Sequence, residues 1–175
     1  YTSVVKAARG GPSIIRTFDI GGDKPARYLA MPAEENPFLG VRGVRLYPLH
    51  AHVLRTQLRA ILKASAHGPV KIMAPMIATA AEARWFREQV DAAKSELSAE
   101  GASFDAATPV GVMLEIPAAV FAIRELAREA DFFSVGTNDH SVGTQEDYPL
   151  ADVPAKIVTY TADSLTYSPM PPNYF

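Results

Sequence analysis

The chain has 175 residues, of which 48% are hydrophobic and 21% charged, a composition typical of one globular domain. Seventeen basic and nineteen acidic side chains give a net charge of −2, which argues against a general nucleic-acid or membrane-surface binder. Because cysteine is absent from these residues, disulfides, thiolate metal sites and a cysteine nucleophile within them are excluded. No apolar run reaches the about 20 residues of a membrane span, and we expect a cytoplasmic protein.

Short apolar segments alternate with longer segments of helical periodicity along the first 139 residues. The segments predicted as strands are Ser13–Phe18, Val70–Ile77, Pro109–Glu115 and Asp131–Gly136. The segments predicted as helices are His50–Ala66, Thr79 to about Ala99, where Thr79 and Glu82 have the spacing of a capping box, and Pro117–Arg128. Strands that alternate with helices predict an α/β fold with a parallel sheet.

Two stretches depart from this alternation. Asp23–Pro48 contains four prolines and few periodic apolar residues, which favours a long irregular loop with a functional role. Residues 140–175 contain five of the fourteen prolines and no arginine, and short strands are predicted there at Lys156–Thr161 and Ser164–Tyr167. We therefore place a boundary near residues 140–150, between a domain of residues 1–139 and a divergent, irregular or β-type tail of residues 140–175.

Polar residues stand at the carboxyl ends of the predicted strands, where α/β folds keep their active sites. Arg16 and Asp19 follow the first strand, Glu115 ends the third, and Asn138 and Asp139 follow the fourth. Any one of these residues alone is more simply a solvent-facing polar group. Because they share one edge of different strands, we interpret them together as a candidate site.

Glu115 and Asp139 are candidate ligands of a single hard cation. Mg²⁺ commonly binds one or two carboxylates and completes its coordination with water and substrate oxygens. Asn138 could add a hydrogen bond to the substrate. The alternative is structural, with a helix-entry carboxylate before Pro117 and an Asx turn at Asn138, and spacing alone does not separate the two.

Arginines form a second candidate group. Arg16 lies within an apolar strand, where a buried charge needs a partner, and Arg42 lies in the long loop. Converging guanidinium groups suit a small dianion. Arg45 is interpreted as a solvated loop charge. The arginines at helical spacing are interpreted as solvated helix faces: Arg55, Arg59, Arg84 and Arg87. The histidines show no pattern of a triad or a zinc site.

Six motifs in consistent order carry a family resemblance. They are IIRTFDIGGDK (Ile14–Lys24), EENPFLGVRGVR (Glu34–Arg45), QLRAILKASAHG (Gln57–Gly68), VKIMAPMI (Val70–Ile77), GVMLEIPAA (Gly111–Ala119) and DFFSVGTND (Asp131–Asp139). Over roughly residues 4–139 the chain resembles the phosphoenolpyruvate-binding barrel of the PEP-utilising enzymes. Its motifs are most similar to those of Enzyme I of the sugar phosphotransferase system.

The resemblance implies a TIM-type (β/α)₈ barrel that binds phosphoenolpyruvate and Mg²⁺ at its carboxyl face. The family passes the phosphoryl group to a histidine on a separate domain and then to a phosphocarrier protein in sugar uptake. Carried over by position, Arg16 and Arg42 hold the phosphate, Asn138 contacts the substrate, and Glu115 and Asp139 bind Mg²⁺. Such chemistry needs charge neutralisation and alignment more than covalent help.

The chain also departs from the family pattern. After Asp139 it reads His-Ser-Val-Gly where the family has a leucine, a Gln-Tyr pair and a substrate-binding arginine, and the family's proton-donating cysteine has no counterpart. By the family's plan these residues supply the third to sixth of eight strands. We therefore expect an incomplete barrel of about four strands, inactive alone, that forms a homo-oligomer or is part of a longer chain.

Two other functions stay open. The first is a Mg²⁺-dependent lyase or aldolase-type barrel acting on pyruvate-like acids, although the motifs around Asp19 and Arg42 favour the phosphotransferase. The second is a non-catalytic remnant that serves as a binding or interaction module.

Overall fold

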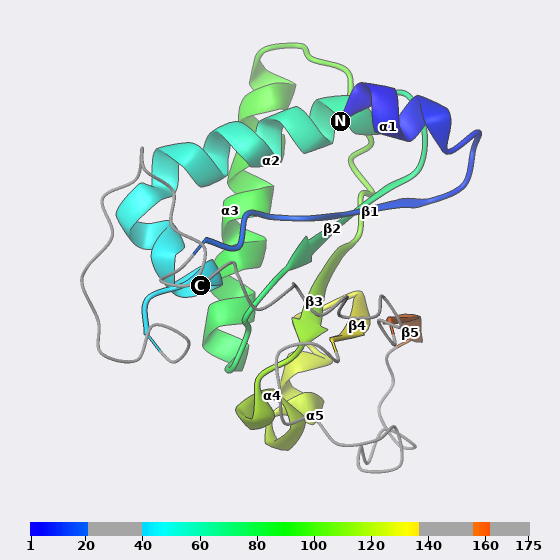
Figure 1. The fold of residues 1–175 in the computed structure, drawn as a ribbon. Helices are drawn as coiled ribbons and strands as arrows, with labels where there is room; N and C mark the ends of the chain where they lie inside the picture. The colour runs from blue at the N-terminus through cyan, green and yellow to red at the C-terminus, as the bar shows by residue number, and fades with distance from the viewer. Residues whose placement is uncertain (21–39, 137–155, 162–175) are drawn as a thin grey trace, which may run out of the picture.

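Five parallel strands form one sheet in the computed structural model, which describes residues 1–20, 40–136 and 156–161 (Figure 1). The strands are β1 (Ser13–Arg16), β2 (Val70–Ala74), β3 (Val110–Leu114), β4 (Phe132–Gly136) and β5 (Lys156–Thr161). Their order in the sheet is their order in the chain, and each neighbouring pair is parallel.

The predicted parallel α/β fold is confirmed, and so is the strand at Lys156–Thr161. Within the described residues the sheet is open, with β1 and β5 as its edges. The predicted strand Ser164–Tyr167 lies outside the described residues.

Helices connect the strands, as the periodicity predicts. They are the 3₁₀ helix η1 (Gly43–His50), α2 (Ala51–Ser65), α3 (Ala80–Ala99), α4 (Pro117–Phe121) and α5 (Ile123–Leu126), while α1 (Thr2–Ala7) precedes β1. None of these helices has both the length and the apolar composition needed to cross a bilayer, as far as the described residues go.

The predicted strands Ser13–Phe18 and Val70–Ile77 end earlier, at Arg16 and Ala74, and three helical details also differ from the sequence-based prediction. Helix α1 was not predicted. The irregular stretch was predicted to run to Pro48, but its residues from Gly43 onward form η1. The helix predicted from Pro117 to Arg128 is divided at Ala122, whose φ of −93° and ψ of 12° depart from α-helical values. A proline at the first helical position remains correct for α4.

The predicted capping box at the start of α3 is confirmed. The Thr79 hydroxyl oxygen accepts the Glu82 backbone N–H at 3.2 Å, and the Glu82 carboxylate accepts the Thr79 N–H at 2.9 Å. These bonds satisfy two amide groups that a helix start otherwise leaves without partners. The start of α3 is thereby fixed directly after the segment that follows β2.

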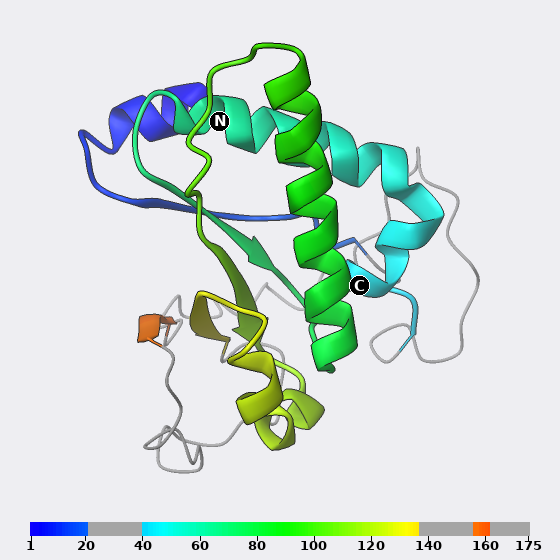
Figure 2. The same ribbon diagram turned by 180° about the vertical axis from the view of Figure 1, so that it is seen from behind.

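The hydrophobic core lies between the sheet and the long helices. Buried side chains of α2 and α3, such as Leu58 and Phe86, pack in one cluster with Ile72 of β2 and Val112 of β3. Figure 2 shows α3 in front of β1 and β2, with α2 crossing behind its upper part. The burial alternates along β1, where Ile15 faces this core and Arg16 does not. This alternation is confined to β1, since neighbouring residues of β4, such as Phe132 and Phe133, are both buried.

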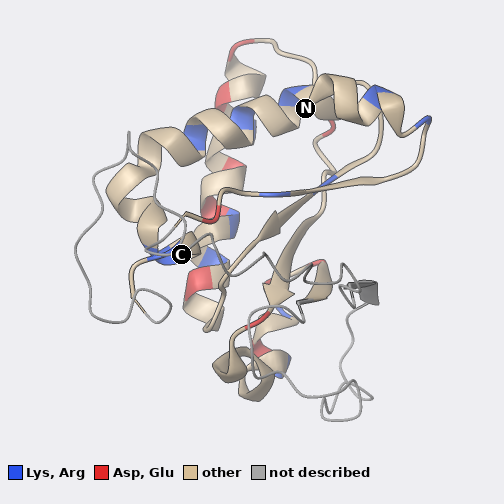
Figure 3. Cartoon of the chain, viewed as in Figure 1, with Lys and Arg blue, Asp and Glu red and all other residues tan. Residues whose placement is uncertain are grey.

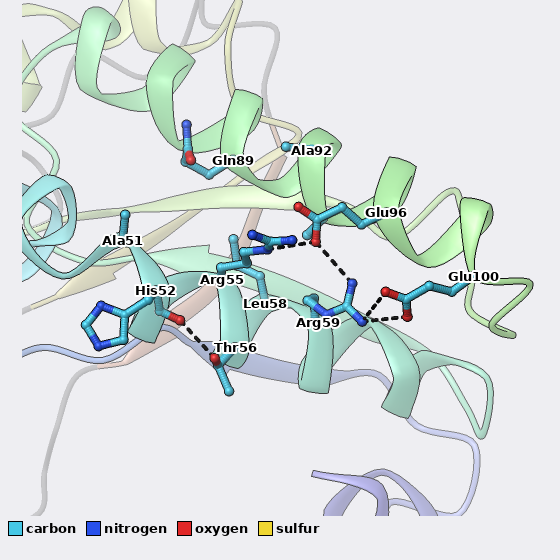
Figure 4. A pocket seen from close by; sticks show the side chains of 11 residues that line it. Ala51, His52, Arg55, Thr56, Leu58, Arg59, Gln89, Ala92, Glu96 and Glu100 are labelled. Atoms are coloured by element: carbon cyan, nitrogen blue, oxygen red, sulfur yellow. Dashed lines mark hydrogen bonds and ion pairs between the residues drawn. The ribbon is translucent and has the colours of Figure 1, made fainter.

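Charged side chains connect α2 to α3. Figure 3 shows Lys and Arg along α2 and Asp and Glu along α3. The Arg55 guanidinium lies 2.9 Å from Glu96, and Arg59 lies 3.0 Å from Glu96 and 2.6 Å from Glu100 (Figure 4). On α3, Arg84 and Arg87 form ion pairs of 2.7 and 3.1 Å with Glu129 and Asp131. The interpretation as solvated faces holds for Arg55 and Arg84, whose side chains are 63% and 62% exposed, but not for Arg59 and Arg87, at 21% and 30%. The sequence pattern did not show that all four have acidic partners.

Candidate functional site

Arg16 ends β1 at the carboxyl edge of the sheet. Its side chain is 39% exposed, and Nη1 lies 3.9 Å from the Met113 sulfur on β3. The expectation that its charge is buried inside an apolar strand was wrong. The reason is that side chains alternate between the two faces of a strand. Arg16 is on the same face of β1 as Ile14, and α2 and α3 do not cover that face. The guanidinium therefore stands at the carboxyl edge, accessible to a small ligand.

Asp19 brings Arg16 and Arg42 together. One of its carboxylate oxygens, Oδ2, lies 2.9 Å from Nη2 of Arg42 and 3.8 Å from Nη1 of Arg16. The Arg42 and Asp19 side chains are each only 1% exposed. The sequence placed Arg16 and Arg42 twenty-six positions apart, and the fold joins both guanidinium groups to one carboxylate.

Tyr47 ties η1 to the end of β1, and the two segments lie side by side in Figures 1 and 2. Its hydroxyl donates to the Phe18 carbonyl oxygen at 2.8 Å and shares a hydrogen bond of 2.7 Å with the Thr17 hydroxyl. Burial raises the pKa of the Tyr47 hydroxyl far above its ordinary value of 10.0, while the hydrogen bond with Thr17 opposes the shift. Tyr47 thus remains a neutral hydrogen-bonding group. Arg45, interpreted from the sequence as a solvated loop charge, is instead half-buried on η1.

Glu115 follows β3 and is buried at the same edge. Its Oε1 accepts the backbone N–H of Met76 at 2.5 Å. Met76 has a φ of +58°, and Gly43 beside it has a φ of +53°. A Cβ on Gly43 would lie 2.7 Å from Met76 Cβ and 3.3 Å from Asp19 Oδ1. A glycine after Arg42 therefore lets η1 approach both the Asp19 carboxylate and the segment that holds Glu115.

Asn138 and Asp139 lie outside the described residues, so their distances to Glu115 are not part of this geometry. Among the residues that the structure does describe, no group of three or more His, Cys, Asp and Glu side chains gathers as a metal site. Glu115 nevertheless suits a hard cation, since a carboxylate offers about four lone-pair positions and can accept an amide while it ligates Mg²⁺.

The sequence profile of the PEP-binding domain of PEP-utilising enzymes matches residues 1–151. The chain belongs to this family. Its relatives include proteins named phosphoenolpyruvate-protein phosphotransferase, and these are enzymes. The family assignment agrees with the six motifs and with the parallel α/β units that the structure shows.

Three relatives illustrate the extent of the likeness. The chain is 49% identical over 139 residues to multiphosphoryl transfer protein 2 of Escherichia coli (strain K12). The aligned segment covers 79% of this chain and 17% of that protein. The chain is 48% identical to the phosphoenolpyruvate-protein phosphotransferases of Listeria monocytogenes and Haemophilus influenzae, covering 79% of this chain and 24% of each. The chain thus spans a quarter or less of the length of these relatives. A solved citrate lyase from Burkholderia xenovorans LB400 aligns at a TM-score of 0.43 and 25% identity, over 58% of this chain and 30% of that one.

Proposed function

We propose that this PEP-binding domain holds phosphoenolpyruvate and Mg²⁺ for phosphoryl transfer to a histidine and then to a phosphocarrier protein in sugar uptake. The observation that supports it most is the grouping of Arg16 and Arg42 about Asp19, beside a buried Glu115 at the same carboxyl edge. Two guanidinium groups and an adjacent carboxylate provide what a phosphorylated three-carbon acid with a bound divalent cation requires.

Each residue has a proposed part in this chemistry. Arg16 and Arg42 bind phosphate oxygens, and Asn138 contacts the substrate. Glu115 and Asp139 would hold Mg²⁺, which when bound neutralises negative charge on the substrate. Phosphoryl transfer is accelerated mainly by positioning and by electrostatic stabilisation, so fixed cationic groups suffice for the part played by this edge of the sheet.

The proposal places the remaining groups that phosphoryl transfer requires outside these 175 residues. The phosphotransferase relatives are about four times as long as the matched segment, since it covers 24% of each. We accordingly propose that these 175 residues bind the substrate without turning it over, and that they act within a longer chain or a homo-oligomer. The division into residues 1–139 and a tail of residues 140–175 belongs to the same proposal.

Isothermal titration calorimetry of the chain with phosphoenolpyruvate, in the presence and absence of Mg²⁺, tests the proposal. We expect binding heat that depends on Mg²⁺ and an affinity that falls by about tenfold or more in Glu115→Gln, as removal of metal-site groups commonly produces. Asp91→Asn, on the exposed face of α3, is the matched control and should bind as the unsubstituted chain does.

Three outcomes would change the assignment. A folded chain that gives no heat with phosphoenolpyruvate supports the non-catalytic remnant. Mg²⁺-dependent binding of pyruvate or oxalate without any preference for the phosphorylated acid supports the lyase alternative. Phosphate that appears on a carrier protein added to the chain alone would contradict the claim that the chain is incomplete.

A further inference from the structure

We propose that Asp19 is a positioning residue that sets the spacing and orientation of Arg16 and Arg42 for the substrate phosphate. This inference rests on the proposed function, and it assigns a role to a carboxylate that is neither a proposed metal ligand nor a proposed substrate contact. Three observations carry it: the burial of the Asp19–Arg42 pair, the second guanidinium near the same oxygen, and the anchoring of the backbone on both sides of Asp19.

The burial of the pair makes Arg42 depend on Asp19. Both side chains are 1% exposed, and the distance from Arg42 Nη2 to Asp19 Oδ2 is 2.9 Å. Breaking a buried ion pair by neutralising one partner is far more costly than losing an exposed one. Arg42 is therefore held in one orientation at the carboxyl edge before any ligand arrives.

The position of Arg16 extends the argument to the second cation. Its Nη1 lies 3.8 Å from the Oδ2 atom that binds Arg42. Two guanidinium groups repel each other, and a carboxylate between them offsets that repulsion while leaving one net positive charge for an anion. Groups already oriented toward a developing or bound charge cost no reorganisation when the ligand binds.

The backbone around Asp19 is anchored on both sides. The carbonyl oxygen of Phe18, just before it, accepts the Tyr47 hydroxyl at 2.8 Å. The carbonyl oxygen of Ile20, just after it, accepts the Gly43 N–H at 3.3 Å. Both donors come from η1, directly after Arg42. The carboxylate and the guanidinium that it binds are thus fixed to the same two segments.

Affinity for two ligands separates positioning from general stability. Calorimetry with Mg²⁺ compares phosphoenolpyruvate, which carries a phosphate, with oxalate, which does not. In Asp19→Asn, which keeps the side-chain shape, we expect phosphoenolpyruvate affinity to fall by about tenfold or more, as loss of a charge-assisted bond implies. Oxalate affinity should change by less than about threefold, which is under 1 kcal/mol. Asp91→Asn should leave both affinities unchanged.

A double-mutant cycle provides a second test and guards against misfolding. Asp19→Asn combined with Arg42→Gln removes both buried charges, so the double variant should unfold at a higher temperature than Asp19→Asn alone. In the Arg42→Gln background, Asp19→Asn should lower phosphoenolpyruvate affinity by less than it does in the unsubstituted chain, because only Arg16 is left for Asp19 to position. Additive losses, or equal losses for both ligands, would overturn the inference.

Different results would overturn the proposed function and the positioning role of Asp19. If the unsubstituted chain binds neither ligand, the proposed function is wrong and the positioning role falls with it. If the chain binds phosphoenolpyruvate and Asp19→Asn binds it equally well, the proposed function stands and this inference alone is overturned.

Discussion

The backbone N–H of Met76 donates to Oε1 of Glu115 at 2.5 Å, from a residue whose φ is +58°. A left-handed conformation costs a non-glycine residue about 1–2 kcal/mol and persists where surrounding contacts impose it. Met76 is buried and its Cβ and Cγ lie against Gly43. The carboxyl ends of β2 and β3 are thereby linked to η1 at the candidate site.

Replacement of Gly43 by alanine tests this close approach. The left-handed φ costs about 1–2 kcal/mol, and a Cβ placed 2.7 Å from Met76 adds about 1–3 kcal/mol of overpacking. We expect chemical denaturation to show the sum of both effects in Gly43→Ala. Gly101→Ala is the matched control, because Gly101 has a φ of +67° and nothing within 4 Å of its Cβ position. Equal destabilisation of the two variants would contradict the packing at Gly43.

Removal of the Tyr47 hydroxyl should loosen η1 from β1. Tyr47→Phe leaves the partly buried Phe18 carbonyl oxygen without this donor, which costs about 1–3 kcal/mol in the free energy of unfolding. The loss of stability should be larger than for the same substitution at an exposed tyrosine. Tyr1→Phe serves as this control, because Tyr1 is 46% exposed. Urea denaturation at neutral pH measures both.

The same hydroxyl predicts an alkaline pH dependence. Because burial raises the pKa of Tyr47 in the folded state, the hydroxyl ionises first in the unfolded chain, whose ordinary pKa is 10.0. Its contribution to stability is therefore complete below pH 10 and decreases as the pH rises above that value. Tyr47→Phe should show a smaller loss of stability between pH 9 and pH 11 than the unsubstituted chain. Parallel curves would contradict the burial of this group.

The ion pairs between α2 and α3 predict an acid dependence. The hydrogen bond from Arg59 lowers the pKa of Glu100 below its ordinary value of 4.5. A carboxyl with a lowered folded pKa stabilises the fold above the unfolded pKa, and that stabilisation is lost as the pH falls through the folded pKa. Glu100→Gln should melt slightly lower than the unsubstituted chain at pH 7, and the difference should shrink as the pH falls below 4.5. Asp91→Asn on the same helix should show no such convergence.

Local sequence patterns predicted the strands and most helices well, because each depends on neighbouring residues. The capping box at Thr79 and the proline at the start of α4 are of this kind. Patterns failed where a distant partner decides the outcome. Partial burial of Arg45 and exposure of Arg16 depend on which surfaces the helices cover. Glu96 and Glu100 pair with α2 only once the two helices cross.

The sequence predicted that polar residues at the strand ends form the candidate site, but it did not predict which of these residues contact one another. Asp19 stood out as a polar residue after a strand, yet nothing in its spacing from Arg42 shows that the two form a buried pair. Tyr47, Met76 and Gly43 were missed. The glycine directly after Arg42 was the available signal, since a glycine beside a charged residue commonly permits close backbone approach.

The most direct test is the position of a metal ion in crystals of the chain grown with Mn²⁺ and oxalate, located by anomalous scattering. The account predicts one metal peak within direct coordination distance of carboxylate oxygens from both Glu115 and Asp139, with Arg16 and Arg42 on the side of the bound anion. A metal bound elsewhere, or bound by Glu115 while Asp139 points away from it, would contradict the account.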